Sequence, residues 1–155
     1  NIQQDCGRTI TEAVKELVLK FPKYTNEIKL YYSNHRKMIG GIFQDSVNVL
    51  SALKKQNFQC YVLSNWSAET FVGMLDEYPF LKKFEGIMIS GEEKMIKPNQ
   101  KLFKRAIDKY QLIPKETLFI DDNIDNIKAS LKLGFKAIHL VDPYQIEKEI
   151  YQYVN

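Results

Sequence analysis

Four short apolar runs, each followed by a helical pattern, limit the folds open to this 155-residue chain. The runs are rich in β-branched and aromatic side chains and occupy residues 58–63, 86–89, 117–120 and 135–141. After each run, apolar residues recur at the spacing of an amphipathic helix. Short buried strands that alternate with helices are typical of βαβ units, so the sequence predicts an α/β fold. We expect a Rossmann-like parallel sheet with helices on both faces.

Polar residues end three of these runs, and their positions predict where a functional site lies. They are Ser64, Ser90 and the pair Asp121-Asp122. Right-handed crossovers place the carboxyl ends of parallel strands at one edge of a sheet, where such folds bind ligands. We therefore expect these side chains to gather at that edge.

The first part of the chain has no such run. Residues 9–21 and 25–38 show helical spacing, and two consecutive glycines then interrupt the pattern. We predict a small helical domain over residues 1–40 and a separate α/β core over residues 41–155.

Composition excludes several classes of partner. The formal net charge of +3 comes from dispersed lysines rather than a basic cluster, which argues against nucleic-acid binding. No apolar stretch approaches the roughly 18 residues needed to span a membrane. Cys6 and Cys60 are far apart and lack the spacing of a zinc site or a disulfide framework. We expect a cytoplasmic protein.

The adjacent carboxylates of Asp121 and Asp122 suggest a cation site. Like charges at a strand end repel and are partly desolvated, so the pair costs stability unless a cation neutralises it. Mg²⁺ suits such a site, since it takes one or two carboxylates and leaves other positions to water and phosphate. The alternative is a helix N-terminus, where acids are favoured by the dipole and cap free N–H groups.

Other polar residues suggest an anion site beside the carboxylates. Ser64 and Asn65 offer a hydroxyl and backbone N–H groups near a helix start, although Ser64 could equally be a cap. Lys97 is a compact charge suited to phosphate, but a solvated surface lysine has the same appearance. Asn126 could orient the carboxylates or a substrate, or be an ordinary surface residue.

Three motifs in this order resemble those of the haloacid dehalogenase-like (HAD) hydrolases. Leu63-Ser64-Asn65, residues 96–103 and residues 119–126 match the second, third and fourth family motifs. The resemblance is to the branch with an early helical cap, which includes sugar-phosphate phosphatases and the phosphatase domain of soluble epoxide hydrolase. It covers nearly the whole chain, and the first forty residues look like most of the cap.

The resemblance implies a Mg²⁺-dependent phosphatase of a small phosphorylated metabolite, acting through a phosphoaspartate. By position, Ser64 and Asn65 would hold phosphate and Lys97 would neutralise developing charge. Asp122 would ligate Mg²⁺ directly, with Asp121 in support. The paired acids favour a phosphatase over a dehalogenase, which needs no metal and lacks the pair.

The first family motif, Asp-x-Asp at the end of the first strand, is absent. Asp5 follows no strand, and Asp142 is better explained by a turn before Pro143. We therefore expect a core that lacks its first strand, is inactive as given, and has its nucleophile N-terminal to this chain. One alternative is a truncated, non-catalytic binding module. Another, a receiver-like signalling domain, is disfavoured because receivers place the acidic pair first.

An aromatic stripe in the second helical pattern leaves two interpretations open. Tyr31, Tyr32, His35 and Met38 could face a substrate, because caps of this kind close over the site. An aromatic stripe at helical spacing is also typical of simple packing. His35 has no visible Asp or Ser partner, so a catalytic triad is not supported.

Overall fold

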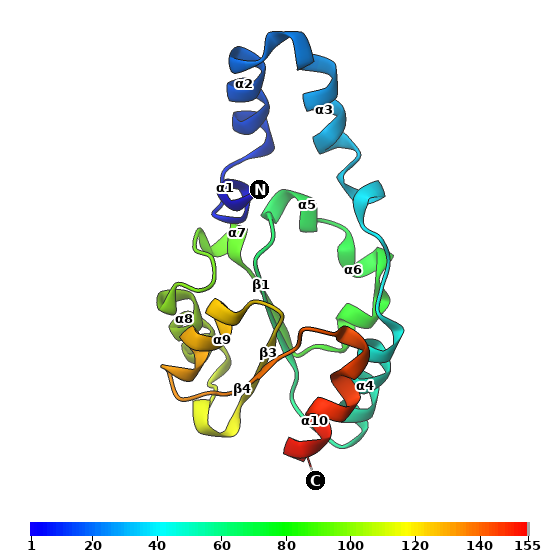
Figure 1. The fold of residues 1–155 in the computed structure, drawn as a ribbon, viewed down its shortest axis with the longest axis vertical. Helices are drawn as coiled ribbons and strands as arrows, with labels where there is room; N and C mark the ends of the chain where they lie inside the picture. The colour runs from blue at the N-terminus through cyan, green and yellow to red at the C-terminus, as the bar shows by residue number, and fades with distance from the viewer. Residues whose placement is uncertain (155) are drawn as a thin grey trace.

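The computed structural model describes residues 1–154, which form an α/β core and a helical extension. In Figure 1 the core lies below, and the helices α2 and α3 project above it. Among these residues, no helix combines the length and the apolar character that crossing a membrane requires.

The core contains two parallel two-stranded sheets. β1 (Tyr61–Ser64) pairs with β2 (Gly86–Ile89), and β3 (Leu118–Asp121) pairs with β4 (Lys136–His139). All four strands lie within or next to the predicted runs, which confirms the α/β fold class. The difference from the prediction is that β1 and β3 are not hydrogen-bonded to each other in the described part of the chain.

Helices cover the sheets from two sides. α8 (Gln100–Tyr110) contacts α9 (Ile124–Leu131), while α4 (Gln44–Lys55) contacts α10 (Ile146–Val154). Figure 1 shows the first pair and the second pair on opposite sides of the strands. Further core elements are α7 (Ser90–Glu93), η3 (Pro79–Lys83), η4 (Pro114–Glu116) and η5 (Pro143–Gln145).

The apolar core consists of two clusters. One contains Met88, Leu102 and Ala106, and the other contains Phe103, Ala129 and Phe135. α8 supplies residues to both because Leu102, Phe103 and Ala106 on its apolar stripe are buried. Leu63 of β1 also packs against both clusters, so it connects the packing of the two sheets.

Two predicted helices are interrupted in the structure. The second helical pattern gives α3 (Thr25–Ser33) and then a separate 3-10 helix, η2 (His35–Met38). Helical spacing beyond β1 also predicts one helix, but the chain forms α5 (Ala68–Phe71) and α6 (Met74–Glu77). Gly73 between them has φ +78°, a left-handed conformation that a continuous α-helix does not contain.

The helical extension is a hairpin with little buried surface. α2 (Ile10–Lys20) contacts α3 and is joined to it by η1 (Pro22–Tyr24), while α1 (Ile2–Asp5) lies nearest the core. α2 begins with a complete capping box between Thr9 and Glu12.

Candidate functional site

The ends of β1 and β3 are joined by the amine of Lys97. Its Nζ atom donates hydrogen bonds to the Leu63 carbonyl oxygen and to Asp121 Oδ2, each over 2.7 Å. Leu63 lies on β1 and Asp121 ends β3, so one side chain bridges the two sheets. The sequence prediction that Lys97 and Asp121 meet at a strand edge is consistent with this geometry.

The Lys97–Asp121 ion pair is buried. The two side chains are only 9% and 6% exposed. Water therefore screens their attraction weakly, and each charge depends on the other for compensation. The surface-lysine interpretation of Lys97 is excluded by this burial.

Asn65 holds the backbone of Lys97. Its Oδ1 accepts a hydrogen bond from Lys97 N over 2.8 Å, and its Nδ2 donates to Lys97 O over 3.0 Å. Both ends of the side-chain amide are therefore used to fix the lysine loop against β1. Because the side-chain amide is occupied, the phosphate contact predicted for Asn65 would have to come from its backbone N–H.

Asp121 is fixed by three donors. Besides Lys97, its Oδ1 accepts from Asn123 N over 2.9 Å and from Asn126 Nδ2 over 2.8 Å. Asn126 is 5% exposed, so it is not an ordinary surface residue. Its hydrogen bond to Asp121 matches one of its two predicted roles, that of orienting a carboxylate. Its own Oδ1 is buried without a hydrogen-bond partner among the described residues.

The carboxylate of Asp122 is exposed and makes no hydrogen bond or ion pair within residues 1–154. Its backbone oxygen lies 2.9 Å from His139 Nε2. Asn123, rather than either aspartate, caps α9 by accepting from Asp125 N. The acidic pair therefore does not supply the side-chain cap of α9, because Asn123 performs that role.

The available donors fit part of a Mg²⁺ site. The described chain contains no group of three or more His, Cys, Asp or Glu side chains able to hold a metal ion. Asp122 nevertheless offers a free carboxylate, and both oxygens of Asp121 are occupied by N–H donors. Mg²⁺ needs only one or two protein carboxylates, so this arrangement suits Asp122 as a ligand and Asp121 as support.

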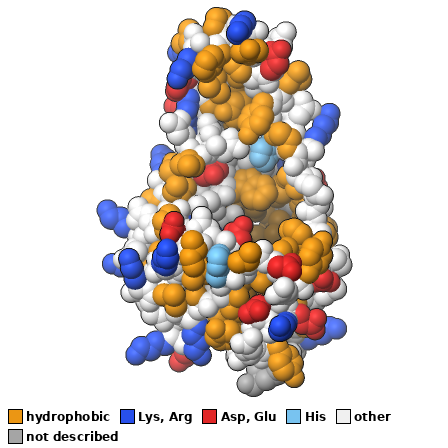
Figure 2. All heavy atoms as spheres, in the orientation of Figure 1, with side chains coloured by type: hydrophobic (Ala, Val, Ile, Leu, Met, Phe, Trp, Pro, Cys, Tyr) orange, Lys and Arg blue, Asp and Glu red, His pale blue; other side chains and the backbone are white. Residues whose placement is uncertain are grey.

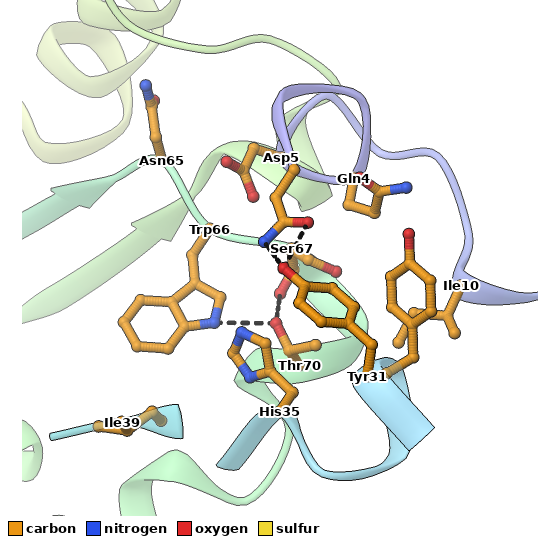
Figure 3. Close-up of a pocket in the computed structure, with 12 residues that line it drawn as sticks. Gln4, Asp5, Ile10, Tyr31, His35, Ile39, Asn65, Trp66, Ser67 and Thr70 are labelled. Atoms are coloured by element: carbon orange, nitrogen blue, oxygen red, sulfur yellow. Dashed lines mark hydrogen bonds between the residues drawn. The ribbon is translucent and has the colours of Figure 1, made fainter. Parts of the chain in front are cut away.

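A cavity of about 270 Å³ lies beside this site, between the helical extension and the loop after β1. Asn65, Trp66 and Thr70 line it from the core, and Tyr31 and His35 line it from the extension (Figure 3). Figure 2 shows the surface hollowed between the two parts, with apolar side chains around the hollow.

The residues of the aromatic stripe in the extension therefore have different surroundings. Tyr31, Tyr32 and His35 line the cavity, whereas Met38 is half exposed and does not. Sequence reasoning did not identify Trp66 as a site residue. Its position directly after Leu63-Ser64-Asn65 was the signal that could have done so, because it places Trp66 beside any ligand of that motif.

The loop that carries Trp66 is held by the start of α7, directly after β2. Ser90 Oγ accepts from Trp66 N over 3.0 Å, and Gly91 N donates to Trp66 O over 3.0 Å. Ser90 is fully buried, so water does not compete for its hydrogen bond to Trp66. A Cβ at Gly91 would lie 2.4 Å from the Ala68 nitrogen, which is why only glycine allows this close approach.

Comparison with known proteins gives a consistent picture. Residues 2–140 match the family profile described as haloacid dehalogenase-like hydrolase. A sesquiterpene phosphatase from Aspergillus oryzae is 28% identical over 70% of this chain and 55% of its own length. An enolase-phosphatase from Shewanella woodyi is 30% identical over 66% of this chain and 46% of its own.

A third relative has a different activity in its name: an (S)-2-haloacid dehalogenase from a Pseudomonas species is 26% identical over 63% of this chain and 43% of its own. The chain thus spans about half the length of the curated relatives it matches.

Solved structures share the fold. A HAD family enzyme from Bacteroides thetaiotaomicron, in complex with magnesium and inorganic phosphate, superposes with a TM-score of 0.73. The two are 26% identical, and the match covers 88% of this chain and 71% of that enzyme. A HAD-superfamily hydrolase from Ehrlichia chaffeensis, 22% identical, gives a TM-score of 0.59 over 91% of this chain and 75% of its own.

Proposed function

Because the chain belongs to the haloacid dehalogenase-like hydrolase family, we propose that its strand-end site serves a Mg²⁺-dependent phosphatase of small phosphorylated metabolites. The family resemblance expected from the sequence is confirmed. The reaction, the metal and the substrate class are the proposal.

The buried Lys97–Asp121 pair is the observation that carries it. A lysine amine held at the junction of two strand ends is a fixed positive charge where a phosphate would approach. The Ser64 hydroxyl ends β1 at the same junction and makes no hydrogen bond to another described residue. A fixed charge and a free donor are what a transferring phosphoryl group needs for electrostatic stabilisation.

Neither candidate aspartate in the described chain is placed to act as the nucleophile. Asp5 ends the short helix α1, and Asp142 accepts from Tyr144 N over 3.0 Å in the turn predicted for it. We infer that a further parallel strand carrying Asp-x-Asp lies between β1 and β3, where the two sheets are not hydrogen-bonded. A strand there would end beside Lys97.

In this proposal the first aspartate of Asp-x-Asp attacks phosphorus while the bond from phosphorus to the alcohol oxygen breaks, and the alcohol leaves with a proton given by the second aspartate. Water then hydrolyses the phosphoaspartate to aspartate and inorganic phosphate. Lys97 and Ser64 orient the phosphoryl oxygens, and Asn65 and Asn126 keep Lys97 and Asp121 in place. Mg²⁺, held in part by Asp122, would supply further charge stabilisation.

The test uses a protein that carries the proposed Asp-x-Asp strand together with this chain. It should release phosphate from p-nitrophenyl phosphate only when Mg²⁺ is present. Absence of phosphate release across a panel of metabolite monophosphates would favour the non-catalytic module. Halide release from 2-chloropropionate without added metal would instead favour a dehalogenase.

A further inference from the structure

We propose that His139 is a positioning residue for Asp122, the proposed ligand of Mg²⁺, and that it acts through the Asp122 backbone. The inference rests on the proposed function, in which Asp122 holds the metal. It assigns a role to a side chain on β4, a strand that lies outside the three sequence motifs.

Strand pairing places His139 beside the acidic pair. β4 pairs with β3 in parallel, and His139 is the register partner of Asp121 (Figure 1). Beyond this pair, Leu140 N donates a hydrogen bond to Asp121 O over 3.0 Å. The carboxyl end of β4 is therefore fixed against the backbone of the acidic pair, and the His139 ring lies at that end.

The His139 ring binds the next peptide group of β3. Its Nε2 lies 2.9 Å from the Asp122 carbonyl oxygen. A carbonyl oxygen only accepts hydrogen bonds, so Nε2 carries a proton and donates it. Together, Leu140 N and His139 Nε2 bind the consecutive carbonyl groups of Asp121 and Asp122.

Asp122 has few other contacts to fix its position. It lies between the last residue of β3 and Asn123, the N-cap of α9. The Asp121 carboxylate has three donors, whereas the Asp122 carboxylate has no hydrogen bond or ion pair in residues 1–154. Within that range, His139 is the one side chain that forms a hydrogen bond with Asp122.

Holding this peptide group favours metal binding. A carboxylate on a fixed backbone loses less conformational freedom when it ligates a cation than one on a mobile loop. Hydrogen-bonding partners of metal ligands strengthen metal binding for the same reason. His139 is exposed, so water competes for its bond and the effect should be moderate.

Calorimetric titration with Mg²⁺ measures the effect, on a protein that carries the proposed Asp-x-Asp strand together with this chain. His139→Phe keeps a ring but removes the donor, so the Kd for Mg²⁺ should rise about fivefold, the equivalent of about 1 kcal/mol. His139→Gln retains an N–H donor at a similar distance from the backbone. It should bind Mg²⁺ within about twofold of the unsubstituted protein.

A control variant and a second measurement separate positioning from support of the fold. Lys136→Phe places the same ring at the other exposed position of β4 and should not weaken Mg²⁺ binding. With p-nitrophenyl phosphate as substrate, His139→Phe should raise the Mg²⁺ concentration for half-maximal activity by a larger factor than it lowers kcat. A residue that only supported the fold would lower the melting temperature and leave the Mg²⁺ requirement unchanged.

Asp122→Asn separates this inference from the proposed function. Weaker Mg²⁺ binding in Asp122→Asn with unchanged binding in His139→Phe would overturn the inference alone. Equal weakening in His139→Gln and His139→Phe would overturn the donor role. Unchanged binding in both Asp122→Asn and His139→Phe would overturn the metal site as well. If no phosphate were released, the phosphatase reaction would be wrong, while weaker Mg²⁺ binding by His139→Phe would still support the inference.

Discussion

The strand-end site and the helical extension are held in place by different kinds of interaction. In the core, Lys97 and Asp121 are buried and joined by a charge-assisted hydrogen bond of 2.7 Å. In the extension, Leu19 and Leu30 remain 76% and 57% exposed, and little of the surface is buried. The comparison indicates a fixed geometry at the proposed site beside a part whose position is weakly determined.

Two polar attachments of the extension to the core go to residues 68–77, in addition to the contacts of α1 with α7 and of His35 with Trp66. The Ile10 N–H at the start of α2 donates to the Glu69 carboxylate over 3.2 Å. At the other end of the hairpin, Arg36 contacts Val72 and Glu77. Both attachments are exposed, so solvent competes for them and each contributes little free energy. The contrast predicts that substitutions in the core abolish activity, while those in the extension adjust it.

The largest effect is expected for Lys97→Met in the full-length protein. Removing the amine should lower kcat about 10³-fold and lower the free energy of unfolding by about 3 kcal/mol, because Asp121 would be left as a buried uncompensated charge. Steady-state kinetics and urea denaturation measure the two quantities.

A double variant separates these effects. Lys97→Met with Asp121→Asn removes both charges, so stability should largely return while activity stays lost. Recovery of activity in the double variant, or full stability in the single one, would contradict the role given to this pair.

Asp122→Asn should change metal dependence without changing stability. Asp122 is exposed and has no side-chain partner in the described chain, so the free energy of unfolding should move by less than about 0.5 kcal/mol. The Mg²⁺ concentration for half-maximal activity should rise at least about tenfold. Asp125→Asn is the matched control, because Asp125 is an exposed acid three residues after Asp122. This substitution should leave the Mg²⁺ requirement unchanged.

Arg36→Ala tests whether the extension is held separately from the core. The Arg36–Glu77 pair is exposed, so its loss should cost at most about 1 kcal/mol. Hydrogen exchange should accelerate in α2 and α3 and remain slow in β1 and β3. Equal acceleration in both parts would remove the distinction drawn between them.

The smallest effect concerns the capping box of α2. Hydrogen bonds from the Thr9 backbone and hydroxyl lower the pKa of Glu12 below its ordinary value. A carboxyl whose pKa is lowered by folding stabilises the helix above its unfolded pKa, and that contribution disappears as pH falls through the folded pKa. NMR amide shifts of α2 should therefore follow acid pH, and Glu12→Gln should remove this dependence. If the amide shifts of α2 still depended on acid pH in that variant, an acid other than Glu12 would be responsible for the dependence.

Much of the fold follows from local pattern. The apolar runs locate all four strands, and Thr9 with Glu12 predicts the start of α2 correctly. The polar residues at the strand ends also predict a shared edge, because crossovers in parallel sheets bring strand ends together, and the Lys97–Asp121 hydrogen bond is consistent with that. These inferences succeed because they depend on neighbours in sequence or on a general rule of topology.

Contacts between distant residues needed the tertiary structure. The amide of Asn65 bonds the backbone of Lys97, 32 positions later, and no local pattern distinguishes that role from a phosphate contact. Trp66 and His35 come together only because the extension folds back over the loop after β1. Side chains of the same type can cap, clamp or bind ligands. The sequence by itself therefore determined the strands, the motif order and the family, while packing decided which donors are occupied and which remain free.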